Sequence, residues 1–422
     1  MKPPVALGVA GLGVVGCGLI DLIRSGGLAQ AGTQVRIAGV CARTRDRDRP
    51  VDVSGYDWFD DPIALARDPG VEVFVELMGG AEGPTRAAVE TALGAGKPVV
   101  TANKALVAEH GDHLARLCAQ SGAGLYFEAA IMAGTPIVRV LRDGLAPARV
   151  RGLRAVLNGT CNFILSEMSQ AEAPFDAALA RAQALGFAEA DPSLDVGGGD
   201  AAQKLAILAS LAFGGAPDLA QVSQRGITGV RPADLMWAHD LGLRLKSLAQ
   251  AQWTPEGVRL SVAPTLLAAD DPLAGLSGAM NGAVISADPI GEVTLLGVGA
   301  GAGATALGVG ADIVEASAAP RTHPFGAERA QPNYAAAEDR LCDWLLIGRD
   351  LGSEGALAFG RRIGVPPDLL GGRHDTVAMR VAQRSAREVY SAMDAVWPDG
   401  TVDAPSVYPI EGDGNPLQGA RP

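Results

Sequence analysis

Residues 5–20 read VALGVAGLGVVGCGLI, an apolar run that ends in a G-x-G-x-x-G turn and continues into a helical pattern. This order is typical of a strand, a tight turn and a helix that bind a dinucleotide. The first glycine makes the turn, the second lets the backbone approach a pyrophosphate, and the third lets helix and strand pack closely. The phosphates rest on the helix N-terminus. We therefore expect this turn to bind a cofactor through Gly11, Leu12, Gly13, Val14, Val15 and Gly16.

The next part of the chain continues to alternate short apolar strands with helical patterns. Further strands are expected at residues 35–40, 71–75, 97–100 and 124–127. Repeated alternation at this spacing favours a parallel, doubly wound sheet of the Rossmann type, so the fold class is α/β. We assign residues 1–140 to this dinucleotide-binding domain.

Strands separated by turn residues characterise the second part of the chain. They are expected at residues 151–157, 258–262, 283–286 and 291–296. This pattern favours a mixed or antiparallel sheet. We expect a second α+β domain over 141–320 for substrate binding, catalysis and dimerisation, whose last helix could return to the cofactor domain. A C-terminal extension covers 321–422.

Arginines follow the second expected strand, where an acid would hydrogen-bond the ribose 2'-hydroxyl of NAD. The chain has Cys41-Ala-Arg43-Thr44-Arg45 there and no acid. Arginine can pair with a 2'-phosphate, so the sequence favours NADP over NAD, with Arg43 as first choice and Arg45 as second. The alternatives are that these arginines are solvated in a loop, or that both cofactors are used.

Composition excludes several classes of partner. The 422 residues carry a formal net charge of -12 and no basic run, which argues against nucleic acid or an anionic membrane surface. The apolar stretches are too short or too rich in glycine to span a bilayer, and the N-terminus lacks a signal pattern. Five scattered cysteines show no metal or disulfide spacing. We expect a cytoplasmic enzyme with a small-molecule substrate and buried cysteines.

A second informative stretch is residues 182–204, AQALGFAEADPSLDVGGGDAAQK. Three glycines precede an apolar helical pattern, so Asp200 lies where a helix begins and Lys204 lies one turn further on the same face. With Glu189 and Asp195 they form a segment carrying both signs of charge. The simpler alternative is that Asp200 caps the helix and Lys204 is its partner on the surface.

A further lysine, Lys104, follows the strand expected at 97–100, in the sequence Thr101-Ala-Asn103-Lys104. Open α/β sheets bind ligands beyond the carboxyl ends of their strands, so Lys104 is a candidate site residue. A lysine must lose its proton before it can act as a base, and a second positive charge nearby favours that loss.

The spacing A-x3-G-F-A-x2-D-P-x2-D-V-x-G-x-D-x3-K over 182–204 resembles the homoserine dehydrogenase signature at every fixed position. VVTANKALVA at 99–108 and NGTCNFIL at 158–165 are similar to further blocks of that family. The resemblance extends from residue 5 to about 315. It implies reversible interconversion of L-aspartate 4-semialdehyde and L-homoserine with NAD(P), a step in threonine, methionine and isoleucine biosynthesis. One departure is Gly197, where many members carry glutamate.

The chemistry of the residues agrees with this reaction, because acids suit an ammonium group and lysines suit a hydroxyl or carbonyl oxygen. We expect Glu189 and Asp200, supported by Asp195, to bind the substrate, Lys204 to be the general acid and base, and Lys104 to assist. The resemblance also implies that Lys104 binds the cofactor, because the family's lysine lies between nicotinamide and substrate. Thr160 could meet a carboxylate or a phosphate at a helix start, although capping by Asn158 or Thr160 is an equal alternative. Carried over from the family, Gly186 would touch the cofactor. Gly301, in a glycine-rich helix start, could do so too, or could only mark a close chain crossing.

The resemblance also implies a monovalent cation, with sodium as first choice, bound by backbone carbonyls of Glu128, Ile131, Ala133 and Thr135. A purely structural loop is the alternative. It implies a homodimer or a larger homo-oligomer. The C-terminal extension could be a degenerate ACT-like regulatory domain, and control by threonine is left open. Competing functions are an NADP-dependent dehydrogenase of a related small hydroxy compound and an inactive NADP-binding regulatory protein.

Overall fold

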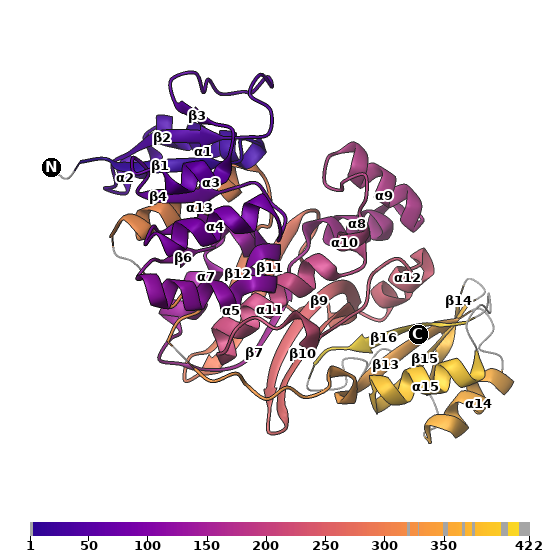
Figure 1. Cartoon of the computed structure of the whole chain (residues 1–422). Helices are drawn as coiled ribbons and strands as arrows, with labels where there is room; N and C mark the ends of the chain where they lie inside the picture. Colours follow the sequence, from indigo (N-terminus) through magenta and orange to yellow (C-terminus); the bar gives the residue numbers. More distant parts are fainter. Residues whose placement is uncertain are drawn as a thin grey trace. The chain divides into compact units, whose positions relative to one another are not determined.

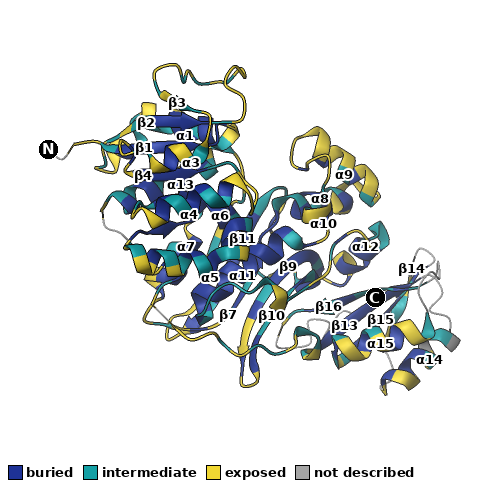
Figure 2. Cartoon of the chain, viewed as in Figure 1, coloured by how far each residue is buried: buried dark blue, intermediate teal, exposed yellow. Residues whose placement is uncertain are grey.

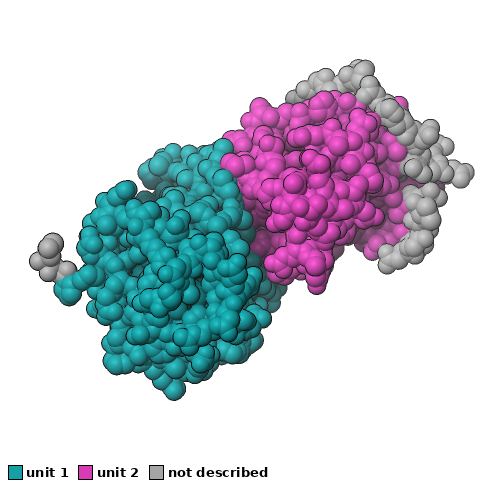
Figure 3. All heavy atoms as spheres, turned by 90° about the horizontal axis from the view of Figure 1, so that it is seen from above, with its two compact units in different colours: residues 1–151, 203–220, 285–332 teal, residues 152–202, 221–284, 333–422 magenta. Residues whose placement is uncertain are grey.

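The structure, a computed structural model, describes residues 3–318, 321–327, 329–348, 353–364, 368–373, 376–397 and 404–412 (Figure 1). The chain forms two compact units (Figure 3). The first contains residues 1–151, 203–220 and 285–332, and the second contains 152–202, 221–284 and 333–422. These units interleave along the sequence. The three contiguous domains with boundaries at 140 and 320 stay a prediction.

The first unit contains a six-stranded parallel sheet in the order β3-β2-β1-β4-β5-β6. Its strands are β1 (Val5–Ala10), β2 (Val35–Cys41), β3 (Asp57–Phe59), β4 (Val73–Glu76), β5 (Val99–Thr101) and β6 (Leu125–Tyr126). The strand order reverses between β1 and β4, which is where such sheets open a crevice for ligands. The prediction of a doubly wound parallel sheet is confirmed.

Helices follow or cover these strands. They are α1 (Val14–Arg24), α2 (Gly27–Gln30), α3 (Pro62–Arg67), α4 (Pro84–Gly94), α5 (Lys104–Ser121), α6 (Ala129–Met132), α7 (Ile137–Arg139) and α13 (Ala302–Ala318). The core is apolar: Leu7 and Val9 of β1 are fully buried, as are Leu19 and Ile20 of α1 (Figure 2). Each such side chain stabilises the fold by roughly 1.5–3 kcal/mol.

Helix α13 packs against α1, although almost 280 residues separate them in the sequence. Val309 and Ile313 of α13 are fully buried in the core of β1 and α1. Gly18 permits the close approach, since a Cβ there would lie 3.2 Å from the Ala302 carbonyl oxygen. The start of α13, and Gly301 before it, is thereby brought to the helix that follows the glycine turn.

The second unit is built on the long antiparallel hairpin of β9 and β10, with β7 antiparallel to β9. The strands of its sheet are β7 (Arg149–Val156), β8 (Val222–Gln224), β9 (Leu243–Thr254), β10 (Gly257–Ala268), β11 (Met280–Asp288) and β12 (Gly291–Val298), although β12 and the end of β11 fall within the residue range of the first unit. Its helices are α8 (Gly159–Ala171), α9 (Phe175–Ala184), α10 (Ser193–Val196), α11 (Gly199–Phe213) and α12 (Pro232–Asp240). The expected mixed sheet is confirmed; α11 begins in this unit and ends in the first.

The C-terminal part has a β-α-β-β-α-β order. It comprises β13 (Leu341–Gly348), α14 (Ser353–Ile363), β14 (Asp368–Arg373), β15 (Thr376–Ser385), α15 (Ala386–Val396) and β16 (Ser406–Ile410). The four strands lie in the order β16-β13-β15-β14, and every neighbouring pair is antiparallel. This is the split β-α-β arrangement of ferredoxin-like modules. A regulatory role for it stays a prediction, and residues 413–422 lie outside the described chain.

None of the helices in the described chain is both long and apolar enough to cross a membrane. All five cysteines are buried and unbridged, as the sequence predicted.

Candidate active site

A cavity of about 720 Å³ lies over the glycine turn of the first unit, at the strand-order reversal. Gly11, Leu12 and Gly13 line it. Gly11 has φ +106°, and a Cβ there would lie 2.3 Å from the Leu77 carbonyl oxygen. A Cβ on Gly16 would lie 2.0 Å from the Gly11 carbonyl oxygen, whereas at Gly13 it would meet nothing within 4 Å. Glycine is therefore required at 11 and 16 because neighbouring backbone atoms lie too close for a side chain. Gly13 instead leaves open space beside the start of α1.

Val14 and Val15 form the first turn of α1 and do not line this cavity. Val14 is 73% exposed. They can contribute backbone N–H groups to a phosphate at the helix start, but their side chains do not shape the pocket.

Three arginines from the segment that follows β2 also line this cavity. They are Arg43, Arg47 and Arg49. The Arg49 guanidinium donates hydrogen bonds to the carbonyls of Arg45 and Arg47, both at 2.9 Å. It also stacks over the Trp58 ring, with its central carbon 5.5 Å from the ring centroid. Arg49 therefore holds the loop that presents Arg43.

Arg47 and Arg49, which line the cavity, were not among the candidates from the sequence. The alternating arginine pattern RTRDRDR at 43–49 is the signal that could have found them. Arg45, the second choice for a 2'-phosphate, instead lies over Trp58 and does not line the cavity.

Lys104 begins α5, and its neighbours fix that position. The Asn103 side chain accepts a hydrogen bond from Leu106 N at 3.1 Å and donates to the Gly80 carbonyl at 2.7 Å. Thr101 Oγ1 donates at 2.6 Å to Glu76, a carboxyl without solvent exposure. Burial raises the pKa of Glu76, while the hydrogen bond from Thr101 opposes that rise. Capping by Asn103 thus fixes the start of α5, and with it the position of the half-buried Lys104 just beyond β5.

The second unit brings three residues of the acidic stretch and the NGTCNFIL block together. The Asn158 side chain donates to Asp195 at 2.7 Å and to Asp200 at 2.8 Å. It also accepts from Cys161 N at 2.7 Å, so Asn158 caps α8. Thr160 Oγ1 donates to the Phe187 carbonyl at 2.6 Å. The capping alternative for Asn158 is therefore present, and its amide reaches the acids as well.

Asp200 and Lys204 lie one turn apart at the start of α11, at 5% and 8% exposure. The alternative of a surface ion pair is wrong, because neither side chain is exposed. A buried charge requires partners, so this helix start must carry opposite charges in close proximity. Such a place can bind an ammonium group and move a proton.

The other predicted residues are more exposed. Glu189 is exposed, and its carbonyl accepts from the Gln183 side chain at 3.0 Å. Gly186 and Gly301 have φ values of +77° and +116°, which side chains other than glycine rarely adopt. Gly197 sits tightly after α10, since a Cβ there would lie 2.6 Å from the Ser193 carbonyl oxygen. A glutamate at 197 would therefore need a different local turn.

The segment expected to bind a cation folds around a buried carboxylate in the first unit. The Glu128 side chain accepts from Val138 N at 2.7 Å and from Arg139 N at 3.0 Å, so its charge is used within the protein. Burial raises the pKa of Asp312, which accepts from Glu128 N, to about 8. Helix α6 ends at Met132, and the next residue, Ala133, has a φ of +51°. The Thr135 carbonyl accepts from Ile137 N at 2.8 Å.

Lys246 supports α8 from β9. Its amino group donates to Asn162 Oδ1 at 3.1 Å and to the Leu276 carbonyl. Burial lowers the pKa of Lys246 to about 8. Sequence patterns gave no sign of this residue, because a lysine in an alternating strand normally faces solvent.

Lys246→Met should change how stability depends on pH. The folded pKa lies near 8 and the ordinary value is 10.5, so the unfolded chain binds this proton more tightly. Wild-type stability therefore rises between pH 8 and 10.5 and lacks this contribution below pH 8. Relative to the methionine variant, wild type should gain up to about 1.4 kcal/mol per pH unit in that window. Urea unfolding of both proteins across the window measures this, and a constant difference would contradict it.

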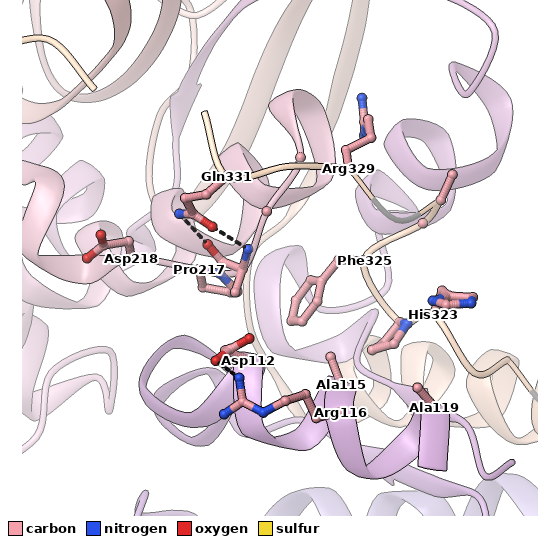
Figure 4. Close-up of a pocket in the computed structure, with 16 residues that line it drawn as sticks. Asp112, Ala115, Arg116, Ala119, Pro217, Asp218, His323, Phe325, Arg329 and Gln331 are labelled. Atoms are coloured by element: carbon pink, nitrogen blue, oxygen red, sulfur yellow. Dashed lines mark hydrogen bonds and ion pairs between the residues drawn. The ribbon is translucent and has the colours of Figure 1, made fainter. Parts of the chain in front are cut away.

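A separate cavity of about 560 Å³ in the first unit contains none of the predicted site residues (Figure 4). Asp112 and Arg116 of α5 pair with each other on one side, and Gln331 holds Ala216 on the other. Arg329 donates to the Leu211 carbonyl at 2.8 Å, near the end of α11. Its guanidinium is well placed to stabilise a helix C-terminus. We assign this region to anchoring α11 and not to the reaction.

Comparison with known proteins agrees with these features. The family model described as "Homoserine dehydrogenase, NAD binding domain" matches residues 11–128, and the family model described as "Homoserine dehydrogenase" matches residues 136–314. A homoserine dehydrogenase of Synechocystis sp. is 40% identical over 315 residues, 74% of this chain and 72% of that protein.

Two solved structures extend the comparison. A homoserine dehydrogenase from Thiobacillus denitrificans has a TM-score of 0.89 at 31% identity, covering 98% of this chain and 99% of that one. A hyperthermophilic archaeal homoserine dehydrogenase in complex with NADPH has a TM-score of 0.65 at 31% identity, covering 75% and 98%. The chain therefore belongs to the homoserine dehydrogenase family of NAD(P)-linked oxidoreductases, which interconvert L-homoserine and L-aspartate 4-semialdehyde.

Proposed function

We propose that this homoserine dehydrogenase prefers NADP(H), and that Lys204 exchanges the substrate proton with help from Lys104. The observation that carries the proposal is the start of α11. Asp200 and Lys204 are both more than nine-tenths buried there, one turn apart, and Asn158 holds the acid in place. A buried acid and lysine on one helix face offer both an ammonium site and a proton donor.

The acids bind the amino-acid part of the substrate. Asp200 and Glu189 receive its ammonium, and Asp195 supports them. The Thr160 hydroxyl already donates its proton to the Phe187 carbonyl. To donate to a substrate carboxylate, Thr160 would have to break that hydrogen bond. Backbone N–H groups at the start of α8 can meet the carboxylate without such a change.

The lysines act at the reacting oxygen. In reduction, Lys204 gives its proton to the aldehyde oxygen; in oxidation, neutral Lys204 takes the hydroxyl proton. Lys104 polarises the same oxygen. Bound NADPH supplies the hydride, and Gly11, Leu12, Gly13 and Gly16 shape the turn that would hold its pyrophosphate, with Gly186 and Gly301 as further contacts. Initial rates of NADPH oxidation with L-aspartate 4-semialdehyde test the reaction directly.

Arg43→Gln should weaken NADPH binding at least tenfold and leave NADH binding within about twofold. A hydrogen bond to a charged group contributes about 1.5–3 kcal/mol, and only NADPH carries the 2'-phosphate. Fluorescence titration gives both dissociation constants. Arg45→Gln is the matched control, because Arg45 does not line the cavity and should leave both constants unchanged. Equal losses for NADPH and NADH in Arg43→Gln would exclude the 2'-phosphate role.

We also propose a sodium ion at the carbonyl groups of Glu128, Ile131, Ala133 and Thr135. The φ of +51° at Ala133 supports this, because it turns the backbone out of the α6 direction. Gly308 allows α13 to approach the Ala133 carbonyl, since a Cβ on Gly308 would lie 2.4 Å from the Ala133 carbonyl oxygen. Backbone carbonyls suit a hard cation.

Homodimerisation and a cytoplasmic location complete the proposal. Leu296 and Val298 on β12 are 50% and 52% exposed, and adjacent exposed apolar side chains on a strand favour a protein contact. Five buried cysteines without a disulfide agree with a reducing compartment.

A further inference from the structure

We propose that Asn158 is a positioning residue for the reaction, which sets Asp195 and Asp200 as a pair of carboxylates for the substrate ammonium. The inference rests on the proposed substrate role of these acids. Asn158 would act only through them and would not itself touch the substrate.

The Asn158 amide uses all of its hydrogen-bonding groups except one acceptor position. Its nitrogen donates to Asp195 Oδ1 at 2.7 Å and to Asp200 Oδ2 at 2.8 Å, and its oxygen accepts from Cys161 N at 2.7 Å. The orientation of the amide follows from these partners, since only the oxygen can accept from an N–H. The side chain is 3% exposed, so water does not compete for these bonds.

The two acids belong to different elements, and nothing in the covalent chain fixes their separation. Asp195 lies in α10 and Asp200 in α11, and residues 197–199 between them are all glycine. Two carboxylates on one nitrogen repel each other, so they stay together only while donors hold them. Asn158 supplies one donor to each.

The charge of the pair indicates what it binds. Asn158 is neutral, so it positions two negative charges without cancelling either. A pair of carboxylates suits a cationic group, and the α-ammonium of an amino acid is such a group. This pairing would select amino acids over hydroxy acids of the same length.

The support behind Asn158 is rigid on both sides. Asn281, which is fully buried, donates to the carbonyl of the preceding residue, Leu157, at 2.9 Å. On the following side, Cys161 Sγ donates to the Asp195 carbonyl at 3.2 Å, and Asn162 donates to the Gly278 carbonyl at 2.9 Å. These hydrogen bonds hold the Asn158 side chain and its two carboxylate partners, which we call the clamp, in place. The clamp can therefore set the positions of Asp195 and Asp200 before the substrate arrives.

Two variants separate the clamp from the helix cap. Asn158→Ser and Asn158→Asp both keep an oxygen that can accept from Cys161 N, since serine and aspartate are good N-caps. Both lose the two donors, and aspartate adds a third negative charge beside the pair. The thermal midpoint of Asn158→Ser should remain close to that of wild type, whereas that of Asn158→Asp should be lower because a third carboxylate is buried beside the pair. The NADPH dissociation constants of both variants should remain close to that of wild type. A purely structural role predicts no specific change in substrate discrimination.

The decisive measurement compares L-homoserine with 4-hydroxybutyrate, which lacks only the ammonium group, as substrate or as competitive inhibitor. In both variants we expect KM for L-homoserine to rise at least tenfold with a smaller change in kcat. The preference for L-homoserine over 4-hydroxybutyrate should fall by a similar factor. The acidic limb of the kcat/KM profile should also move to higher pH in Asn158→Asp, because the added charge favours protonation of the pair.

Two results would overturn the inference: wild-type KM and discrimination in Asn158→Ser, or equal losses for both compounds. If the serine variant does not fold, the isosteric aspartate variant carries the same comparison. Wild-type enzyme without homoserine turnover would contradict the proposed function itself, and so the two failures are distinguishable.

Discussion

Alanine at position 204 is expected to lower kcat for L-homoserine oxidation by about 10²- to 10⁴-fold, the usual contribution of a positioned proton-transfer group. Lys204 is 8% exposed and lies in α11 one turn after Asp200, so bulk water cannot readily take over its role in proton transfer. The variant should still bind NADPH, because the cofactor cavity is lined by residues 11–85. Initial rates in both directions, together with a fluorescence titration of NADPH, measure these effects.

Lys204→Arg distinguishes proton transfer from simple charge. Arginine keeps the positive charge but stays protonated in proteins, so it cannot act as the base in oxidation. Its kcat should therefore be close to that of the alanine variant. Recovery of most of the activity by arginine would assign Lys204 an electrostatic role only. Turnover like that of wild type in Lys204→Ala would remove the residue from the mechanism.

The parts of the fold that the sequence predicted depend on local rules. The glycine turn, the parallel alternation and the helix start at Asp200 each follow from the conformational needs of a few adjacent residues. The predicted strand at 71–75 is observed as Val73–Glu76, and that at 124–127 as Leu125–Tyr126. Small differences of this kind arise because strand ends are set by the neighbouring strand.

The features that escaped prediction join residues far apart in the chain. Arg49 finds its place through the ring of Trp58, and Asn158 reaches Asp200 across 42 residues. Lys246 is buried only because α8 and the loop at Leu276 close over it. No periodicity encodes such pairs. The sequence indicated that Asn158 could cap a helix, but its second use depends on where the acidic loop folds back.

Gly11→Ala is expected to destabilise the protein by several kcal/mol, on the order of 3–5, and to abolish high-affinity NADPH binding. Alanine would have to adopt φ +106°, and its methyl group would lie 2.3 Å from the Leu77 carbonyl oxygen. The obstacle is the backbone that follows β4, which cannot move without shifting the sheet. Thermal unfolding of the cofactor-free protein, followed by circular dichroism, measures the loss.

Gly13→Ala is the matched variant, and it separates the two uses of glycine in one turn. Gly13 has φ -82° and ψ -159°, which alanine can adopt, and a Cβ there meets nothing within 4 Å. The cofactor-free variant should therefore unfold like wild type, while its affinity for NADPH falls at least tenfold because the methyl group occupies space left for the pyrophosphate. Unchanged affinity would show that the phosphates lie elsewhere. A large loss of stability in Gly13→Ala would mean that the open space is filled by the protein itself.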